Sequence, residues 1–227
     1  MFAKSDRRMS PLPHLDLREM TTDDWEDIID LASKMWFDQE EIPTEEARKL
    51  AATIDTHLTL KGATDGIVVI DTDSDRLVGV IAFRGPTLPA KRVQGWHEVA
   101  IAKALARGDD IGGEVAIGLH SFEGEMRRYL DLFDMKRTRD YNGAILLLLL
   151  DPAYQGQGIG REMMQRTLEW FRSQGCSWVF LDTDDTLDFA FYEHFGWKRA
   201  VEFPSTFEIF GKVYTPVEYI YEYQVSP

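Results

Sequence analysis

The sequence has 227 residues, of which 44% are hydrophobic and 28% are charged. This composition is ordinary for a folded globular chain with a sizeable core, so it argues against a disordered protein. The 39 acidic residues outnumber the 25 basic ones, which gives a formal net charge of −14. Such a charge opposes binding to nucleic acid or to an anionic membrane surface, and it favours the approach of a small cationic molecule, with a plain solvated acidic surface as the alternative.

Cysteine and histidine usage gives no sign of a metal or disulfide framework. Cys176 is the single cysteine, and the five histidines are widely scattered. The segment HEVAI at His97 is not H-E-x-x-H, because Ile101 stands at the second histidine position. The chain starts with a polar segment unlike a signal peptide, and its longest apolar run, 144–150, is far shorter than the roughly 20 residues that span a bilayer. We therefore expect a cytoplasmic protein without a metal.

The N-terminal part of the chain predicts two helices followed by a hairpin. The segment 16–39 begins with a short strand-like piece and continues as a helix, in which apolar residues recur at helical spacing. A second helix is expected to start after Pro43 and to stop near Gly62. Two apolar runs, at 66–71 and 76–85, are separated by polar residues and predict a β-hairpin.

The remaining elements alternate between helices and strands. From 85 to 142 the pattern is irregular and indicates helical segments separated by glycines. The run ILLLLL at 145–150 is apolar on both faces, as a central buried strand is. An amphipathic helix ending at Gly175 follows, then a strand, a short helix over 186–196 and two late strands. This order predicts an α/β domain with a helical insertion at 85–142.

Three glycines, Gly156, Gly158 and Gly160, stand between the apolar run and the following helix. Glycine allows positive φ angles and a close approach of the backbone, and a helix N-terminus favours an anion. The turn therefore indicates a cradle for a phosphate-like anion, with a plain tight turn as the alternative. Neither G-x-x-x-x-G-K-[ST] nor G-x-G-x-x-G fits, because Arg161 stands at the position where each pattern needs another residue.

Two segments resemble signatures of the GNAT superfamily of N-acetyltransferases. Residues 155–160 read QGQGIG and match the Q/R-x-x-G-x-G/A signature, and FAFYEHFGWKR at 189–199 resembles the second signature, A-x-x-[FL]-Y-x-x-x-G-[FW]. The pair stands at the separation usual for the family, so the resemblance is firm over 143–199. Over 17–83 the resemblance rests on the order of the predicted helices and strands, and over 84–141 there is none.

The resemblance implies a fold and a cofactor. The fold is a GNAT-like mixed central β-sheet flanked by helices, opened between the strands at 145–150 and 178–182, with the helical insertion between the third and fourth strands. Acetyl-CoA is implied to lie in this gap, with its pyrophosphate on the amides of the glycine loop and its pantetheine arm along the preceding strand. The residues implied to bind it are Leu148, Leu149, Leu150, Gln155, Gly156, Gln157, Gly158, Ile159, Gly160 and Arg161.

Acetyl transfer to an amine needs a neutral nucleophile, a polarised carbonyl and a proton for the departing thiolate. Tyr192 matches the tyrosine that serves as general acid in many GNAT enzymes; the alternative is a half-buried core aromatic. The strand at 144–150 offers no carboxylate, although many relatives carry their general base there. Asp182 and Asp184 are our candidates for the base, with ordinary loop capping as the alternative.

The sequence thus predicts a single domain, 1–227, that transfers an acetyl group from acetyl-CoA to a primary amine by direct transfer in a ternary complex. The acceptor is expected to be a small-molecule or peptide amine, without a nucleic acid or membrane partner, and a homodimer stays open because GNAT relatives are often dimers. The alternative function is a non-catalytic acyl-CoA-binding sensor or interaction module. The insertion at 85–142 is expected to select the acceptor, with a packing annex or a dimer surface as the alternative.

Overall fold

The computed structural model describes residues 14–38, 42, 44–60, 62–86, 139–209 and 211–225. Its helices are α1 (Trp25–Trp36), α2 (Glu45–Leu60), α5 (Ile159–Ser173) and α6 (Ala190–His194), with two short 3-10 helices, η1 (Thr22–Asp24) and η2 (Pro152–Tyr154). Its strands are β1 (Leu15–Glu19), β2 (Asp65–Asp71), β3 (Arg76–Arg84), β4 (Gly143–Leu150), β5 (Trp178–Asp184), β6 (Lys198–Pro204), β7 (Phe207–Ile209), β8 (Lys212–Tyr214) and β9 (Val217–Gln224). Nearly all of the expected insertion lies outside the described residues.

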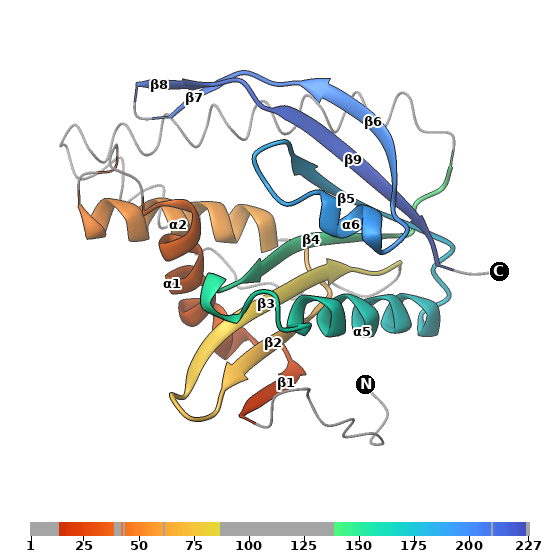
Figure 1. Cartoon of the computed structure of the whole chain (residues 1–227), viewed down its shortest axis with the longest axis horizontal. Helices are drawn as coiled ribbons and strands as arrows, with labels where there is room; N and C mark the ends of the chain where they lie inside the picture. The colour runs from red at the N-terminus through yellow and green to blue at the C-terminus, as the bar shows by residue number, and fades with distance from the viewer. Residues whose placement is uncertain are drawn as a thin grey trace.

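Seven of the strands form one sheet in the order β1-β2-β3-β4-β5-β9-β6 (Figure 1). All neighbouring strands are antiparallel except β4 and β5, which run parallel. A parallel pair needs a crossover connection, and α5 provides it. The expected mixed sheet flanked by helices is therefore confirmed. The strands β7 and β8 pair with each other in a separate ribbon that the sequence did not indicate.

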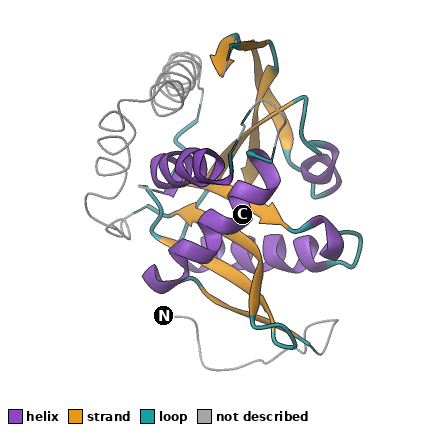
Figure 2. Ribbon diagram, turned by 90° about the vertical axis from the view of Figure 1, so that its left-hand side faces the viewer, coloured by secondary structure: helices purple, strands orange, loops and turns teal. Residues whose placement is uncertain are grey.

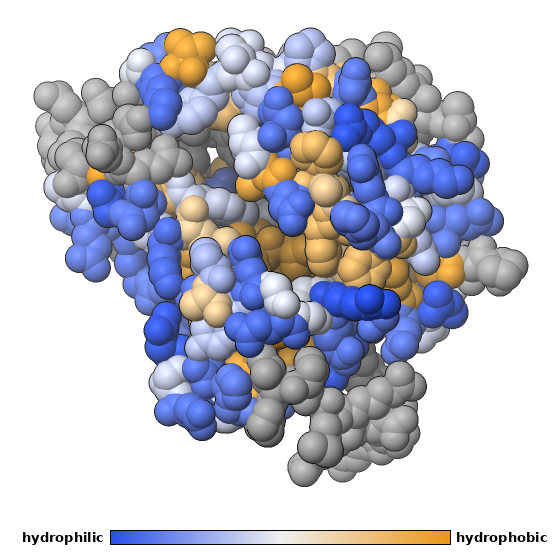
Figure 3. Space-filling model, in the orientation of Figure 1, coloured by the Kyte–Doolittle hydropathy of each residue, from blue (hydrophilic) through white to orange (hydrophobic). Residues whose placement is uncertain are grey.

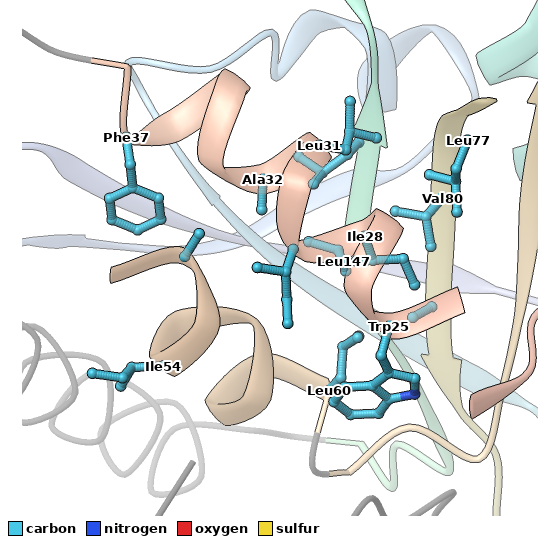
Figure 4. Close-up of a cluster of buried hydrophobic side chains, with 14 of the residues drawn as sticks. Trp25, Ile28, Leu31, Ala32, Phe37, Ile54, Leu60, Leu77, Val80 and Leu147 are labelled. Carbon is cyan, nitrogen blue, oxygen red and sulfur yellow. The ribbon is translucent and has the colours of Figure 1, made fainter. Parts of the chain in front are cut away.

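One hydrophobic core lies between the sheet and the pair of helices α1 and α2. Figure 4 shows Trp25, Ile28 and Leu31 of α1 in the same cluster as Val80 of β3 and Leu147 of β4. The helical spacing of the apolar residues in α1 thus matches its buried face, as the sequence predicts. Complete burial of one such side chain contributes roughly 1.5–3 kcal/mol.

A second core lies on the opposite face of the sheet, so that helices cover both faces (Figure 2). The helix α5 buries Met163, Trp170 and Phe171 there. The rings of Trp170 and Phe171 lie 4.8 and 5.5 Å from the ring of Phe83 on β3. This packing fixes the axis of α5, and with it the position of the glycine loop from which the helix starts.

Asp151, directly after β4, connects the two sides of the domain. Its side chain is 4% exposed, and it accepts hydrogen bonds from Lys34 Nζ of α1 at 2.7 Å and from the Ala153 amide at 3.1 Å. Burial alone would raise the pKa of Asp151, but these two donors and the positive charge of Lys34 hold it below its ordinary value. The ionised carboxylate therefore ties α1 to the start of the glycine loop.

Asp151→Ala is expected to lower the free energy of unfolding at pH 7 by about 1–3 kcal/mol, because the part-buried hydrogen bond from the Ala153 amide to an ionised acceptor is lost. The ammonium of Lys34 adds little to this loss, since that side chain is 54% exposed. The folded-state pKa of Asp151 is depressed, so its contribution is present above the unfolded pKa of about 4 and is lost as the pH falls through the folded value.

Urea unfolding of the wild type and of Asp151→Ala at pH 7 and at pH 2 measures this contribution. The exposed Asp140, changed to Ala, is the control and should shift stability by less than about 0.5 kcal/mol. A difference between wild type and Asp151→Ala that is equally large at both pH values would contradict a role for the ionised carboxylate.

Candidate active site

The strands β4 and β5 pair only where they begin. Gly143 lies opposite Val179 and Ala144 lies opposite Phe180, and the two described strands share no further pair. Beyond this point they diverge, as Figure 1 shows. Such an opening between the same two strands is what the resemblance implied.

An irregularity in β4 accompanies the divergence. On its other side, β4 pairs with β3 so that Phe83 lies opposite Ile145 while Ala82 lies opposite Leu147. Leu146 is therefore an extra residue in the strand, which is the definition of a β-bulge. A bulge bends the strand that contains it, and this bend accounts for the separation of β4 from β5.

The opening leaves one edge of β4 available. The backbone groups of residues 145–150 that face β5 have no strand to pair with, so an extended ligand could pair with them as an added strand. The side chain of Leu149 is buried in the α1 and α2 core, whereas Leu148 and Leu150 are partly exposed beside the α5 core. In the orientation of Figure 1, Figure 3 shows apolar side chains in a hollow near the middle of the molecule.

The glycine loop lies directly at the end of this edge. Gly156 has a φ of +72° and Gly158, the N-cap of α5, has a φ of +84°. In this left-handed region a residue with a Cβ is strained, which explains glycine at both positions. A Cβ added at either position would meet no atom within 4 Å, so open space lies over the loop. Gly160 is helical, and its Cβ would lie 3.5 Å from the ring of Phe191 on α6.

Two side chains of the loop bind to backbone carbonyls beside it. Gln155 Nε2 donates to the carbonyl of Leu150 at 3.1 Å, and Gln157 Nε2 donates to the carbonyl of Ala153 at 3.0 Å. Ile159 is buried in the α5 core. The first amides of a helix have no acceptor within it, so those of α5 are available to an anion over the loop.

A pocket of about 730 Å³ begins beside the loop and lies between α5 and α6. Its size is within the range of small-molecule sites, roughly 300–1,000 Å³. The side chains on its walls include Arg161, Gln165, Arg172, Phe191 and His194. Of these, the sequence analysis named only Arg161 for a ligand. The spacing of the pocket residues along α5 was the available signal, since every third or fourth residue shares one helix face.

Tyr192 lies on α6, half-buried among aromatic rings. Its ring centroid is 5.5 Å from that of Phe191 and 6.5 Å from that of Trp197. Burial and, secondarily, the negative charges of Asp182 and Asp188 raise the pKa of Tyr192. The phenol is therefore protonated at neutral pH and can donate a proton. The helix that carries it spans only five residues, so the prediction of a helix over 186–196 was too long.

The register of β5 places Asp182 and Asp184 on one face of the sheet. They lie opposite Ile220 and Glu218 of β9. The alternate residues of β5, Val179 and Leu181, belong to the second core, which contains α5. Asp184 Oδ1 accepts hydrogen bonds from the backbone amide and the hydroxyl of Thr186, so this carboxylate caps the turn after β5. Asp182 is half-exposed on the strand. Both carboxylates thus lie on the sheet face away from the core around Tyr192.

The described part of the chain gives neither a reactive thiol nor a group of metal ligands. Cys176 is buried, and burial raises the pKa of its thiol to about 11, so it is protonated at neutral pH. Within the described ranges, no group of three or more His, Cys, Asp or Glu side chains could hold a metal ion. No described helix has the length and apolar character needed to cross a membrane.

Two parallel strands that separate beside a glycine loop and a helix N-terminus are the arrangement that the resemblance to N-acetyltransferases implied. The sequence model of the Acetyltransferase (GNAT) family matches residues 25–197. This match covers most of the chain, which therefore belongs to the GNAT acetyltransferase family.

The individual proteins that this chain is similar to share little of its sequence or only a short part of its length. The N-alpha-acetyltransferase RimI of Mycobacterium tuberculosis is 30% identical over 77 residues, which are 34% of this chain and about half, 48%, of that protein. The yncA structure of Salmonella typhimurium, solved with its cofactor acetyl-CoA, is 13% identical with a TM-score of 0.50 and covers 94% of this chain and 95% of that one. The ribosomal-protein-S18-alanine N-acetyltransferase of Escherichia coli is 10% identical with a TM-score of 0.51 and the same coverage, 94% and 95%. At such identities the two structures show the fold alone.

Proposed function

We propose that this protein transfers the acetyl group of acetyl-CoA to a primary amine directly, with both substrates bound together. The observation that carries the proposal is the divergence of β4 and β5 beside a loop with two left-handed glycines. Acetyl-CoA combines an extended amide-containing arm with a pyrophosphate. The open edge of β4 suits the arm, and the amides at the start of α5 suit the pyrophosphate.

The pocket between α5 and α6 supports the same assignment. It starts at Arg161, immediately after the loop that we assign to the pyrophosphate. The nucleotide end of acetyl-CoA would therefore leave the loop towards this pocket, while the pantetheine arm would leave it towards β4. Arg161 and Arg172 lie on the pocket wall together with the acidic Glu169 and Asp188, and we assign the two guanidinium groups to the phosphate on the ribose of CoA.

In the proposed reaction the amine nitrogen attacks the thioester carbon, and the C–S bond breaks as the C–N bond forms. Asp182 accepts the proton that the amine loses, either directly or through a water. Tyr192 donates its phenolic proton to the departing thiolate of CoA. The two side chains lie on opposite faces of the sheet at the opening, so the acceptor and the cofactor would approach from opposite sides.

Asp182→Asn is expected to lower kcat/KM for the amine about 10²-fold at pH 7, because a general base typically contributes 10²–10⁴-fold. Asp184→Asn is the matched comparison. It should cause the smaller loss, since Thr186 already occupies that carboxylate. Release of CoA thiol under steady-state conditions measures both variants.

Each alternative result of this comparison has a definite meaning. A larger loss in Asp184→Asn than in Asp182→Asn would assign the base to Asp184. Wild-type activity in both variants would remove both carboxylates from the mechanism. A loss that is equal at pH 7 and pH 9 would argue against a base. At pH 9 more of the amine is already neutral, so the loss of a base should matter less than at pH 7.

The acceptor that we propose is a small-molecule or peptide amine, and no nucleic acid or membrane partner is proposed. Its approach is favoured by the net charge of −14 if the amine is cationic. Peptides with a free N-terminus are the first to screen, because the Mycobacterium tuberculosis relative is named an N-alpha-acetyltransferase. A cytoplasmic location is part of the same proposal, and a homodimer stays open.

The second candidate is a non-catalytic acyl-CoA sensor. It is favoured by one observation: β4, from Gly143 to Leu150, carries no carboxylate at the opening. The two candidates make the same prediction for acetyl-CoA binding and differ in turnover. Release of CoA thiol with any amine of the screen, above the rate without protein, would exclude the sensor.

A further inference from the structure

The helix that carries Tyr192 cannot hold its own orientation. It spans Ala190–His194, little more than one turn, whereas isolated helices shorter than about 12–15 residues are marginal in water. Its last backbone hydrogen bonds run from the amides of Phe195 and Trp197 to the carbonyl of Tyr192 and from the amide of Gly196 to the carbonyl of Glu193. The position of the Tyr192 hydroxyl must therefore depend on side chains that tie α6 to the sheet.

Glu193, the neighbour of Tyr192 in α6, makes the first of these ties. Its Oε1 accepts a hydrogen bond from the hydroxyl of Tyr221 on β9 at 2.7 Å and another from Arg199 Nη2 of β6 at 3.2 Å. The ring of Tyr221 is fully buried. Burial and the hydrogen bond to Glu193 raise the pKa of Tyr221 against the opposing effect of Arg199, so the phenol stays a donor at neutral pH.

Arg199 makes the second tie and joins both ends of the helix. Its Nε and Nη2 donate to the hydroxyl of Tyr221 at 3.2 and 3.0 Å. Its guanidinium lies over the ring of Tyr219 at 3.8 Å and over the ring of Phe189 at 5.2 Å. Phe189 directly precedes α6, so Arg199 contacts the chain on both sides of Tyr192. Hydrogen bonds linked in this way strengthen one another in a partly buried site.

We propose that Arg199, Tyr221 and Glu193 are positioning residues that hold the Tyr192 hydroxyl at the thioester sulfur during transfer. We call these three residues the α6 clamp. This inference rests on the proposed function, because it acts through Tyr192 as the general acid. The clamp residues do not touch the substrate; they fix the helix on which the acid stands.

Tyr221→Phe tests the clamp, since it keeps the buried ring and removes only the hydroxyl that is hydrogen-bonded to both Arg199 and Glu193. The variant is expected to lower kcat about 10-fold with the KM for acetyl-CoA unchanged, because misplacement removes part of the contribution of a general acid. Tyr141→Phe is the matched control. The hydroxyl of Tyr141 also donates to a carboxylate, Glu222 Oε2 at 2.6 Å, but the hydrogen bonds of the clamp do not include it. Its kcat should equal that of the wild type.

A double-mutant cycle separates positioning from a purely structural role. In a Tyr192→Phe background, Tyr221→Phe should cause no further loss of kcat, because the group that it positions is already absent. The same 10-fold loss in both backgrounds would overturn the inference. If Tyr192→Phe lowers kcat but Tyr221→Phe does not, the clamp fails and the proposed function stands. If Tyr192→Phe leaves kcat unchanged, the acid assignment fails and the clamp fails with it.

Glu193 provides a second route if Tyr221→Phe does not fold. Glu193→Gln keeps an oxygen acceptor for Tyr221 and Arg199 and should retain most of the wild-type kcat. Glu193→Ala removes the acceptor and should lose about as much kcat as Tyr221→Phe, with the KM for acetyl-CoA again unchanged. Equal values of kcat in the Gln and Ala variants would overturn the inference.

Discussion

Gly158→Val is expected to weaken the binding of acetyl-CoA about 100-fold. Gly158 has a φ of +84°, where an L-residue is strained by roughly 1–2 kcal/mol and a β-branched residue by more. The new side chain would also project into the open space over the loop, where we place the pyrophosphate. The loss of 100-fold corresponds to about 2.7 kcal/mol of binding free energy. Calorimetric titration of each protein with acetyl-CoA measures it.

Gly175→Val is the matched control for this prediction. Gly175, just after the other end of α5, has a φ of +71°, and a Cβ added there would also meet no atom within 4 Å. The two variants thus carry the same kind of backbone strain, and their unfolding temperatures should fall by similar amounts. Only Gly158→Val should lose affinity. Equal losses of affinity in both would show that the effect comes from general destabilisation and would contradict binding at the loop.

Tyr192→Phe is expected to lower kcat by roughly 10–10³-fold without changing the affinity for acetyl-CoA. The substitution keeps the ring contacts with Phe191 and Trp197 and removes only the phenolic proton. Steady-state release of CoA thiol gives kcat, and calorimetry gives the dissociation constant. An unchanged kcat would remove Tyr192 from the mechanism and leave it as a core aromatic.

The pH dependence of the wild type carries the same prediction further. Burial and the charges of Asp182 and Asp188 raise the pKa of Tyr192 above the ordinary value of a phenol, about 10. Ionisation of Tyr192 therefore lies above the usual assay range, and kcat should not fall between pH 7 and pH 9 on its account. A basic limb in that range that disappears in Tyr192→Phe would contradict the raised pKa.

The local elements of this fold could be read from the sequence because each depends on a short pattern. The apolar spacing in α1 and the alternation of apolar runs around a polar turn in the β2–β3 hairpin gave both elements. The prediction of glycines with positive φ is confirmed at Gly156 and Gly158 but is wrong for Gly160, which lies within α5. These features follow from backbone sterics and from which face of an element is buried.

Features that depend on distant partners could not be read in this way. The bulge at Leu146 exists only in the register of β4 against β3, since a run of identical leucines contains no signal for an extra residue. The clamp around α6 joins residues of three elements. Glu193 and Arg199 lie within the segment 189–199 that resembles the second signature, but the signature specifies neither of them, and Tyr221 lies outside it. The expected helix over 186–196 starts later because Asp184 caps a turn at Thr186.

The candidate site shows the same division. The strand pattern predicts that Asp182 and Asp184 lie at the end of β5. Because they are two residues apart and side chains alternate along a strand, both lie on one face of the sheet. The contact of Asp184 with Thr186 is one difference between them, and this contact depends on the fold of a loop. The pocket along α5 has a helical spacing that a search for surface patterns could have found.

The most direct test of the whole account is a calorimetric titration of the wild-type protein with acetyl-CoA, with NADH and ATP as controls. The opening between β4 and β5 and the loop at Gly156–Gly160 predict saturable binding of acetyl-CoA at one site per chain, and no comparable binding of NADH or ATP. Absence of binding to acetyl-CoA by the folded protein, or equal binding of all three ligands, would contradict the assignment of the loop and the opening to this cofactor.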